Sequence, residues 1–117
     1  MGRDPTVYLV HMLETARRSV SSVAGCSSEA FAHDPTLRLA AERMIQIIGE
    51  AARRVPDDVR ARHTDIPWRA IVAMRHKLVH DYFEADPDAV WSTIVHDLPP
   101  LIAQLERIVP PEAMEGQ

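Results

Sequence analysis

Apolar residues recur every three or four positions along almost the whole chain, and this spacing constrains the fold more than any other feature. Such a period is typical of amphipathic helices, whereas a half-buried strand alternates every second residue. No segment shows a convincing strand alternation. Leucine, isoleucine, valine, alanine and methionine supply most of the apolar content, and only 5% of the residues are aromatic, a balance that favours helices. The sequence therefore predicts an all-α fold.

The pattern predicts four main helices joined by short connections. Two of them begin at an aspartate followed by a proline, at Asp34 and at Asp86, because aspartate caps a helix N-terminus and proline fits the first turn. The first helix should fade near Gly25. The segment 56–67 should be a loop with room for one helical turn. The helices are expected over residues 9–23, 35–55, 67–79 and 87–108. Together they favour an antiparallel bundle of four to five helices, with residues 1–117 forming a single domain.

Two features of these helices depart from a simple bundle. Ile45, Ile47 and Ala52 widen the apolar stripe of the second helix beyond one core face, which predicts a second buried face. A partner subunit is one candidate to cover that face. Pro99 and Pro100 interrupt the last helix, and each lacks an amide donor, so we expect a kink or a helix break there.

Length and composition narrow the class of protein. A chain of 117 residues with 46% apolar content fits one domain with one core. The N-terminal sequence has no long apolar run, so we expect no signal peptide, and no stretch approaches the roughly 20 apolar residues of a membrane span. Cys26 is the only cysteine, which excludes an intrachain disulfide and favours a cytoplasmic protein without a membrane partner.

The charge is unevenly distributed along the chain. A net charge of −4 argues against a protein that binds nucleic acid non-specifically over most of its surface. The segment 53–77 nevertheless has a net charge of +4, and the rest of the chain has −8. This distribution predicts either one local anion-binding surface or a set of solvated helix faces. The basic residues of the segment are Arg53, Arg54, Arg60, Arg62, Arg69, Arg75 and Lys77.

The segment MRHKLVHDYF, residues 74–83, gathers ionisable side chains at the end of a helix that should belong to the core. His76 and His80 are four residues apart and share a helix face, while Arg75 and His80 diverge by roughly 140° around the axis. They could line one cavity if another helix or subunit supplied the opposite wall. In a purely structural interpretation, His80 caps the helix C-terminus, where the helix dipole favours a cation.

A metal site is a second interpretation of this segment. His76 and His80 have the spacing of a chelating pair, and Asp81 could add a ligand. Lys77, however, stands where the zinc-protease motif has a glutamate, and its ammonium opposes a cation. The remaining ligand would have to come from elsewhere in the chain.

Anion chemistry is the third interpretation. The guanidinium of Arg75 is permanently charged and suits phosphate, and the imidazole of His80 belongs to a class with an ordinary pKa of about 6.5. Such a pair suits metal-independent RNA cleavage. The histidine removes the proton of a ribose 2′-hydroxyl, and the arginine offsets the charge that builds on the phosphoryl oxygens. DNA lacks that hydroxyl and should resist.

The segment resembles the R-x-x-x-x-H signature of the HEPN superfamily. The longer form R-x-x-x-x-H-x-Y, here Arg75, His80 and Tyr82, resembles the HepT-like ribonuclease toxins. The short motif alone has little specificity, but IIGEAARRVP, IPWRAIVAMRHKLVHDYF and VWSTIVHDLPPLIAQLE all look like segments of that family and occur in the same order. The resemblance covers about residues 5–109.

This resemblance implies a HEPN-type bundle that forms a homodimer, with the two motif helices meeting in a composite cleft. It implies that Arg75 and His80 are the catalytic pair for an RNA substrate and that no cofactor is needed. It also implies that Tyr82 is modified with AMP by a cognate MNT-type nucleotidyltransferase antitoxin. The added bulk and negative charge would repel RNA. Alternatively, Tyr82 is a half-buried aromatic that closes the helix end.

Four further residues are candidates for auxiliary roles. His76 stands where many relatives have asparagine, and it could add proton transfer. Glu50 could orient Arg75 or His80, although a simple ion pair with Arg53 or Arg54 is the preferred interpretation. Arg69 and Lys77 could contact the RNA backbone or be merely solvated.

The sequence therefore predicts the toxin of a type VII-like HEPN/MNT toxin–antitoxin system, acting as a metal-independent endoribonuclease. The alternative is a non-catalytic HEPN module that binds a nucleotide or a partner protein. A purely structural adaptor is a third possibility.

Overall fold

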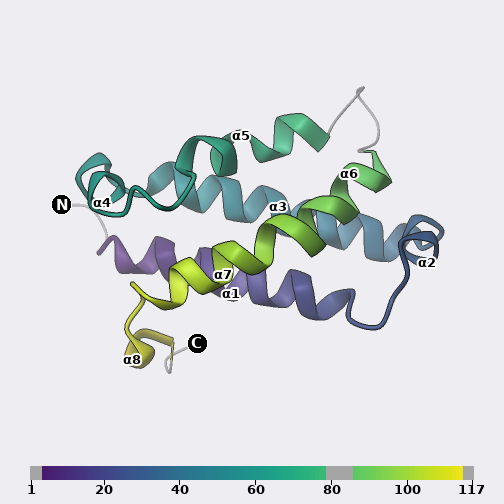
Figure 1. Ribbon diagram of the computed structural model, residues 1–117, viewed down its shortest axis with the longest axis horizontal. Helices are drawn as coiled ribbons and strands as arrows, with labels where there is room; N and C mark the ends of the chain where they lie inside the picture. The colour runs from purple at the N-terminus through teal and green to yellow at the C-terminus, as the bar shows by residue number, and fades with distance from the viewer. Residues whose placement is uncertain (1–3, 79–85, 115–117) are drawn as a thin grey trace.

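The computed structural model describes residues 4–78 and 86–114, with the backbone alone described for residues 75–78. Within these ranges the ordered elements are all helical, as the apolar spacing predicts. The helices pack into an elongated bundle of 42 × 28 × 24 Å (Figure 1). None of the helices in the described ranges is long and apolar enough to cross a membrane.

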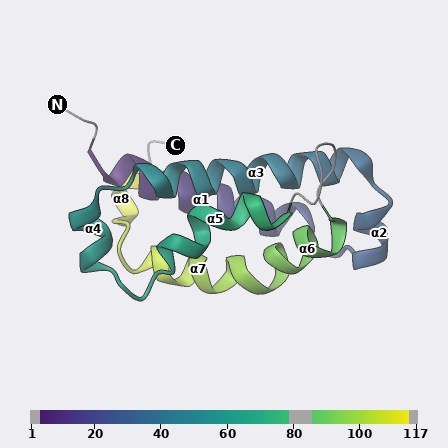
Figure 2. The ribbon, with the colours of Figure 1, turned by 90° about the horizontal axis from the view of Figure 1, so that it is seen from above.

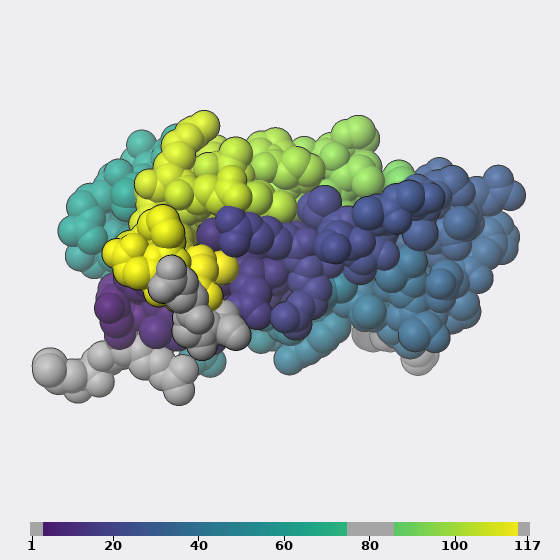
Figure 3. Space-filling view, turned by 90° about the horizontal axis from the view of Figure 1, so that it is seen from below, coloured from purple at the N-terminus to yellow at the C-terminus, as the bar shows by residue number. Residues whose placement is uncertain are grey.

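The bundle alternates in direction along its long axis (Figures 1 and 2). The long elements are α1 (Thr6–Ser22), α3 (Pro35–Arg54), α5 (Trp68–Leu78) and a last helix formed by α6 (Pro87–Ser92), η1 (Thr93–Asp97) and α7 (Leu98–Glu106). Short helices turn the chain at either end: α2 (Ser28–Ala32) between α1 and α3, and α4 (Asp57–Arg62) between α3 and α5. The last short helix, α8 (Pro111–Met114), lies against α1, as the space-filling view shows (Figure 3).

Both aspartate caps predicted from the sequence are present. Asp34 Oδ1 accepts a hydrogen bond of 3.1 Å from the amide of Leu37, and Pro35 occupies the first turn of α3. Asp86 Oδ1 accepts one of 3.0 Å from the amide of Asp88 at the start of α6. Each cap satisfies an amide that the first turn of a helix leaves without a partner. After α1, Gly25 has a φ of 81°, a conformation that favours glycine and ends the helix where predicted.

The short helix α2 was not predicted. Ser27 caps it by accepting a hydrogen bond from the amide of Ala30 at 3.0 Å. Phe31 is fully buried and packs on Trp91 of α6, with 5.5 Å between the ring centroids. A helix of five residues is too short to be stable alone, so its position depends on this one side chain.

Helix α3 is the centre of the bundle, because both α1 and α5 pack on it (Figure 2). Ile45 and Ala52 of the wide apolar stripe have no exposed surface, whereas Ile47 is half-buried. The stripe predicted a second buried face, and the packing of both α1 and α5 on α3 supplies one within the chain. A partner subunit over this stripe stays a prediction.

The last helix does not break at Pro99 and Pro100. The backbone stays helical, and the irregularity lies in the preceding turn, where η1 has π geometry and the amide of Leu98 donates to the carbonyl of Thr93. A proline cannot donate to the carbonyl four residues earlier, and its ring clashes with that group. The two carbonyls concerned belong to Val95 and His96, inside the π turn. The wider turn therefore accommodates both prolines.

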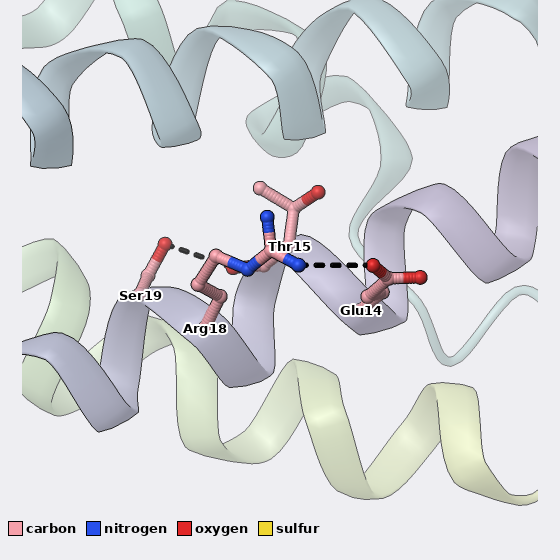
Figure 4. Close-up of polar contacts among 4 residues, drawn as sticks. All are labelled: Glu14, Thr15, Arg18 and Ser19. Carbon is pink, nitrogen blue, oxygen red and sulfur yellow. Dashed lines mark hydrogen bonds and ion pairs between the residues drawn. The ribbon is translucent and has the colours of Figure 1, made fainter. Parts of the chain in front are cut away.

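A buried hydroxyl on α1 is satisfied within the helix. Ser19 has no exposed surface, and its Oγ donates to the carbonyl of Thr15 at 3.0 Å (Figure 4). Arg18 on the outside of the same helix pairs with Glu14 at 3.1 Å. The inward face of α1 can therefore pack against α3 and α7 without an orphaned polar group.

Candidate functional site

The predicted catalytic motif begins in the last turn of α5. Arg75, His76 and Lys77 belong to this helix by their backbone. His80 and Tyr82 lie outside the described residues. The structure therefore gives the start and direction of the motif helix, and the roles of these five residues remain predictions.

The N-terminal half of α5 is fixed by its first turn. Trp68 is 8% exposed, and its indole Nε1 donates to the carbonyl of His63 at 2.9 Å. Ile71 and Met74, three residues apart, are buried on the core side of the helix. These buried side chains, one in each turn, fix the orientation of α5 about its own axis as far as Met74, the residue before Arg75.

Gly49 allows α5 to approach α3 closely. A Cβ atom at Gly49 would lie 3.3 Å from the carbonyl oxygen of Ile71 and 3.6 Å from that of Val72. The first distance is tighter than an ordinary van der Waals contact. The sequence IIGEA therefore has a glycine inside a helix for a packing reason, in spite of the helix-propensity cost of about 1 kcal/mol.

We expect Gly49→Leu to lower the free energy of unfolding by about 1–3 kcal/mol, because the added side chain would push α5 from α3. Gly49→Ala should change it by less than about 1 kcal/mol, since the gain in helix propensity offsets the tight contact. Urea denaturation followed by circular dichroism measures both. Ala40→Leu, at an exposed position of α3, is the control. A Gly49→Leu protein as stable as the wild type would contradict the close approach.

A groove of about 580 Å³ lies between α3, α4 and α5. Its volume is that of a typical small-ligand site. It combines an apolar surface with three arginines and one carboxylate. It is lined by Gly49, Glu50, Arg53, Arg60, Ala61, Trp68, Arg69, Val72 and Ala73.

Arg60 forms a fixed part of the groove wall. Its Nε donates to the carbonyl of Val55 at 2.9 Å, and an Nη donates to that of Arg53 at 3.3 Å. These carbonyls end α3, where a cation is favoured by the helix dipole. Asp57 pairs with Arg60 at 3.5 Å but is fully exposed, so solvent screens most of that interaction.

Arg53 and Arg69 are the other two cations of the groove. Both are exposed, and neither has an ion-pair partner among the residues that the structure describes. Arg69 is a predicted RNA contact, whereas Arg53 was predicted only as part of the basic segment and as a partner of Glu50. The groove brings the two together from α5 and α3.

Glu50 pairs with an arginine other than the predicted ones. Its carboxylate lies 3.7 Å from Arg43, seven residues earlier on α3 and therefore on the same helix face. The preferred prediction of a pair with Arg53 or Arg54 is wrong. Glu50 lines the groove beside Arg53 and a small cavity on the α1 side beside Arg54, but its ion pair is with Arg43.

A second cavity of about 380 Å³ lies between α5 and the last helix. Its charged groups include the carboxylates of Asp65 and Asp97, beside His96. A phosphate would meet negative charge there, so the groove at α3, α4 and α5 is the better anion site. Among the residues described, no group of three or more histidine, cysteine, aspartate or glutamate side chains could hold a metal. The side chains of the predicted His76–His80 pair lie outside the described part of the chain.

Comparison with known proteins identifies the family. The profile described as "Ribonuclease HepT-like" matches residues 12–108. The chain is 37% identical to "Putative RNase TTE0752" of Caldanaerobacter subterraneus subsp. tengcongensis, over 94% of this chain and 98% of the relative. It is 39% identical to "Probable ribonuclease HepT" of Thermococcus cleftensis, over 92% and 98%. The chain therefore belongs to the HepT-like ribonuclease family, as its motifs predict. No solved structure matches it significantly.

Proposed function

We propose that the protein is a metal-independent endoribonuclease in which Arg75 and His80 carry the chemistry. The observation that carries the proposal is membership of the HepT-like ribonuclease family over residues 12–108, with the R-x-x-x-x-H motif starting at the end of α5. The arginine-lined groove along the same helix supports an anionic substrate.

The proposed reaction needs no group beyond the two side chains and the RNA. His80 takes the proton of a ribose 2′-hydroxyl, and the 2′-oxygen attacks the adjacent phosphorus. The bond from phosphorus to the 5′-oxygen of the next nucleotide breaks, and that oxygen takes up the proton that His80 had removed. Arg75 stabilises the negative charge on the phosphoryl oxygens during the attack. His76 and Lys77, in the same helical turn as Arg75, are auxiliary candidates.

We further propose that two copies of the chain form the active unit and that the protein is a toxin controlled by a nucleotidyltransferase antitoxin. Transfer of AMP to Tyr82 would place a phosphate two residues beyond His80 and repel the RNA backbone. Light scattering should give a dimer mass at micromolar concentration. A monomer would remove the composite cleft from the proposal.

Purified wild-type protein should cut single-stranded RNA with a chelator present, as measured by gel electrophoresis of an end-labelled strand. The same strand carrying 2′-deoxyribose should stay intact, because it lacks the attacking hydroxyl. Cleavage that requires an added divalent metal would replace the proposal with a His76–His80 metal site. Tight RNA binding without any cleavage would replace it with a binding module.

A further inference from the structure

The groove between α3, α4 and α5 has two kinds of surface. Its apolar lining, here called the floor, consists of Gly49, Ala61, Trp68, Val72 and Ala73. Its positively charged lining consists of Arg53, Arg60 and Arg69. An apolar surface next to several cations suits a nucleotide, whose base is flat and weakly polar on its faces and whose phosphate is anionic.

The excess of positive charge in the groove favours the binding of an anion. Two of its arginines, Arg53 and Arg69, are exposed and without an ion-pair partner among the described residues. The one carboxylate of the lining, Glu50, is exposed and lies 3.7 Å from Arg43, so solvent screens most of its repulsion of a phosphate. Because the whole chain carries −4, this local excess of positive charge stands out against an acidic background.

The groove and the predicted catalytic motif share one helix. Val72 also lines the groove and precedes Arg75 by three positions of α5, which corresponds to an axial rise of about 4.5 Å and an offset of about 60° around the helix axis. A strand of RNA with one phosphodiester at Arg75 could therefore place a neighbouring nucleotide in the groove.

We propose that the groove between α3, α4 and α5 is a subsite for one nucleotide of the RNA strand, next to the phosphodiester that is cut. Arg53 and Arg69 bind its phosphate, Arg60 completes the positive wall, and the floor at Gly49, Ala61 and Ala73 receives the base. This inference rests on the proposed ribonuclease function. It adds Arg53, Arg60 and the groove floor to the residues that hold the substrate.

Binding of fluorescein-labelled 2′-O-methyl RNA of about twelve nucleotides tests the subsite. This probe keeps the phosphates and has no free 2′-hydroxyl, so binding is measured without cleavage. Fluorescence anisotropy at several salt concentrations gives the Kd and its salt dependence. The double variant Arg53→Gln/Arg69→Gln should bind at least roughly tenfold more weakly, with a salt slope smaller by about 0.7 for the one lost phosphate contact.

Two further variants separate the groove from the general charge of the protein. Arg62→Gln removes one exposed arginine of α4 that does not line the groove, and it should leave the Kd within about twofold and the salt slope unchanged. Ala61→Leu fills the groove from an exposed position without changing the charge. It should weaken binding severalfold at an unchanged salt slope. Circular dichroism melts check that each variant is folded.

RNA binding by the double variant equal to that of the wild type would overturn the subsite. The subsite would also be overturned if the double variant bound ATP more weakly than the wild type does but bound RNA equally well, because the groove would then hold a free nucleotide. A wild-type protein that binds the probe through the groove but cuts no RNA overturns the proposed ribonuclease and leaves the subsite standing. If the wild type cuts RNA and the groove variants bind the probe as tightly as the wild type, the subsite is overturned and the proposed ribonuclease stands.

Discussion

Arg75→Ala and His80→Ala should each lower kcat/KM for RNA cleavage by roughly 10²–10⁴-fold, which is the range expected when a general base or a charge-stabilising group is lost. The two losses have different causes. Without His80 the 2′-hydroxyl keeps its proton, whereas without Arg75 the developing charge on the phosphoryl oxygens has no fixed counter-charge. Initial rates with an end-labelled RNA, at a chelator concentration that removes divalent metal, measure both.

Two matched variants make this result specific. Arg75→Lys keeps the charge but loses the planar fork that binds phosphate through two bonds, so it should recover part of the rate. His76→Asn removes the imidazole beside the motif arginine but keeps a side chain that donates a hydrogen bond, and it should keep most of the activity. Full activity of His80→Ala would remove histidine from the assigned role. Loss of activity in His76→Asn as large as in His80→Ala would make both imidazoles catalytic.

Phe31→Ala should lower the free energy of unfolding by about 3–5 kcal/mol, the range measured for the truncation of buried aromatic residues. Phe31 has no exposed surface, and its ring packs on that of Trp91 at 5.5 Å. It is also the only buried residue of α2. Its loss should therefore release the whole connection between α1 and α3 and leave a cavity beside α6.

Urea denaturation monitored by circular dichroism measures the change in stability. Leu39→Ala is the matched control, because Leu39 is also a large apolar residue but is 66% exposed on α3. That variant should cost less than about 0.5 kcal/mol. A Phe31→Ala protein within about 1 kcal/mol of the wild type would show that α2 contributes little to the fold.

The main helices could be predicted because their signals are local. Aspartate caps at Asp34 and Asp86, and the positive φ of Gly25, depend on a few neighbouring residues. The helix α2 was missed because five residues with one large apolar side chain show no periodicity. Its signal was the serine cap Ser27, followed by an acidic residue in the first turn and by Phe31.

The site could be predicted only in part, because a groove depends on tertiary contacts. The basic segment 53–77 predicted either an anion-binding surface or solvated helix faces, and Arg69 was predicted either as an RNA contact or as a solvated residue. The sequence could not show which of the seven basic residues face one another. The close approach of α3 to α5 at Gly49 and the fixed position of Arg60 decide this. For Glu50, two residues within reach were predicted, and a third residue two turns away is its partner.

The π turn at Thr93–Asp97 has a consequence for reading related sequences. The buried residues of the last helix are Val90, Thr93, Ile94, Leu98, Leu101 and Leu105. Across the π turn, Thr93 and Leu98 are five residues apart and are joined by a backbone hydrogen bond, where an α-helix joins residues four apart. The π turn thus contains one residue more than an α-helical turn. A relative without the two prolines can discard that residue and keep its later leucines in phase, so an alignment gap at this place is compatible with an unchanged core.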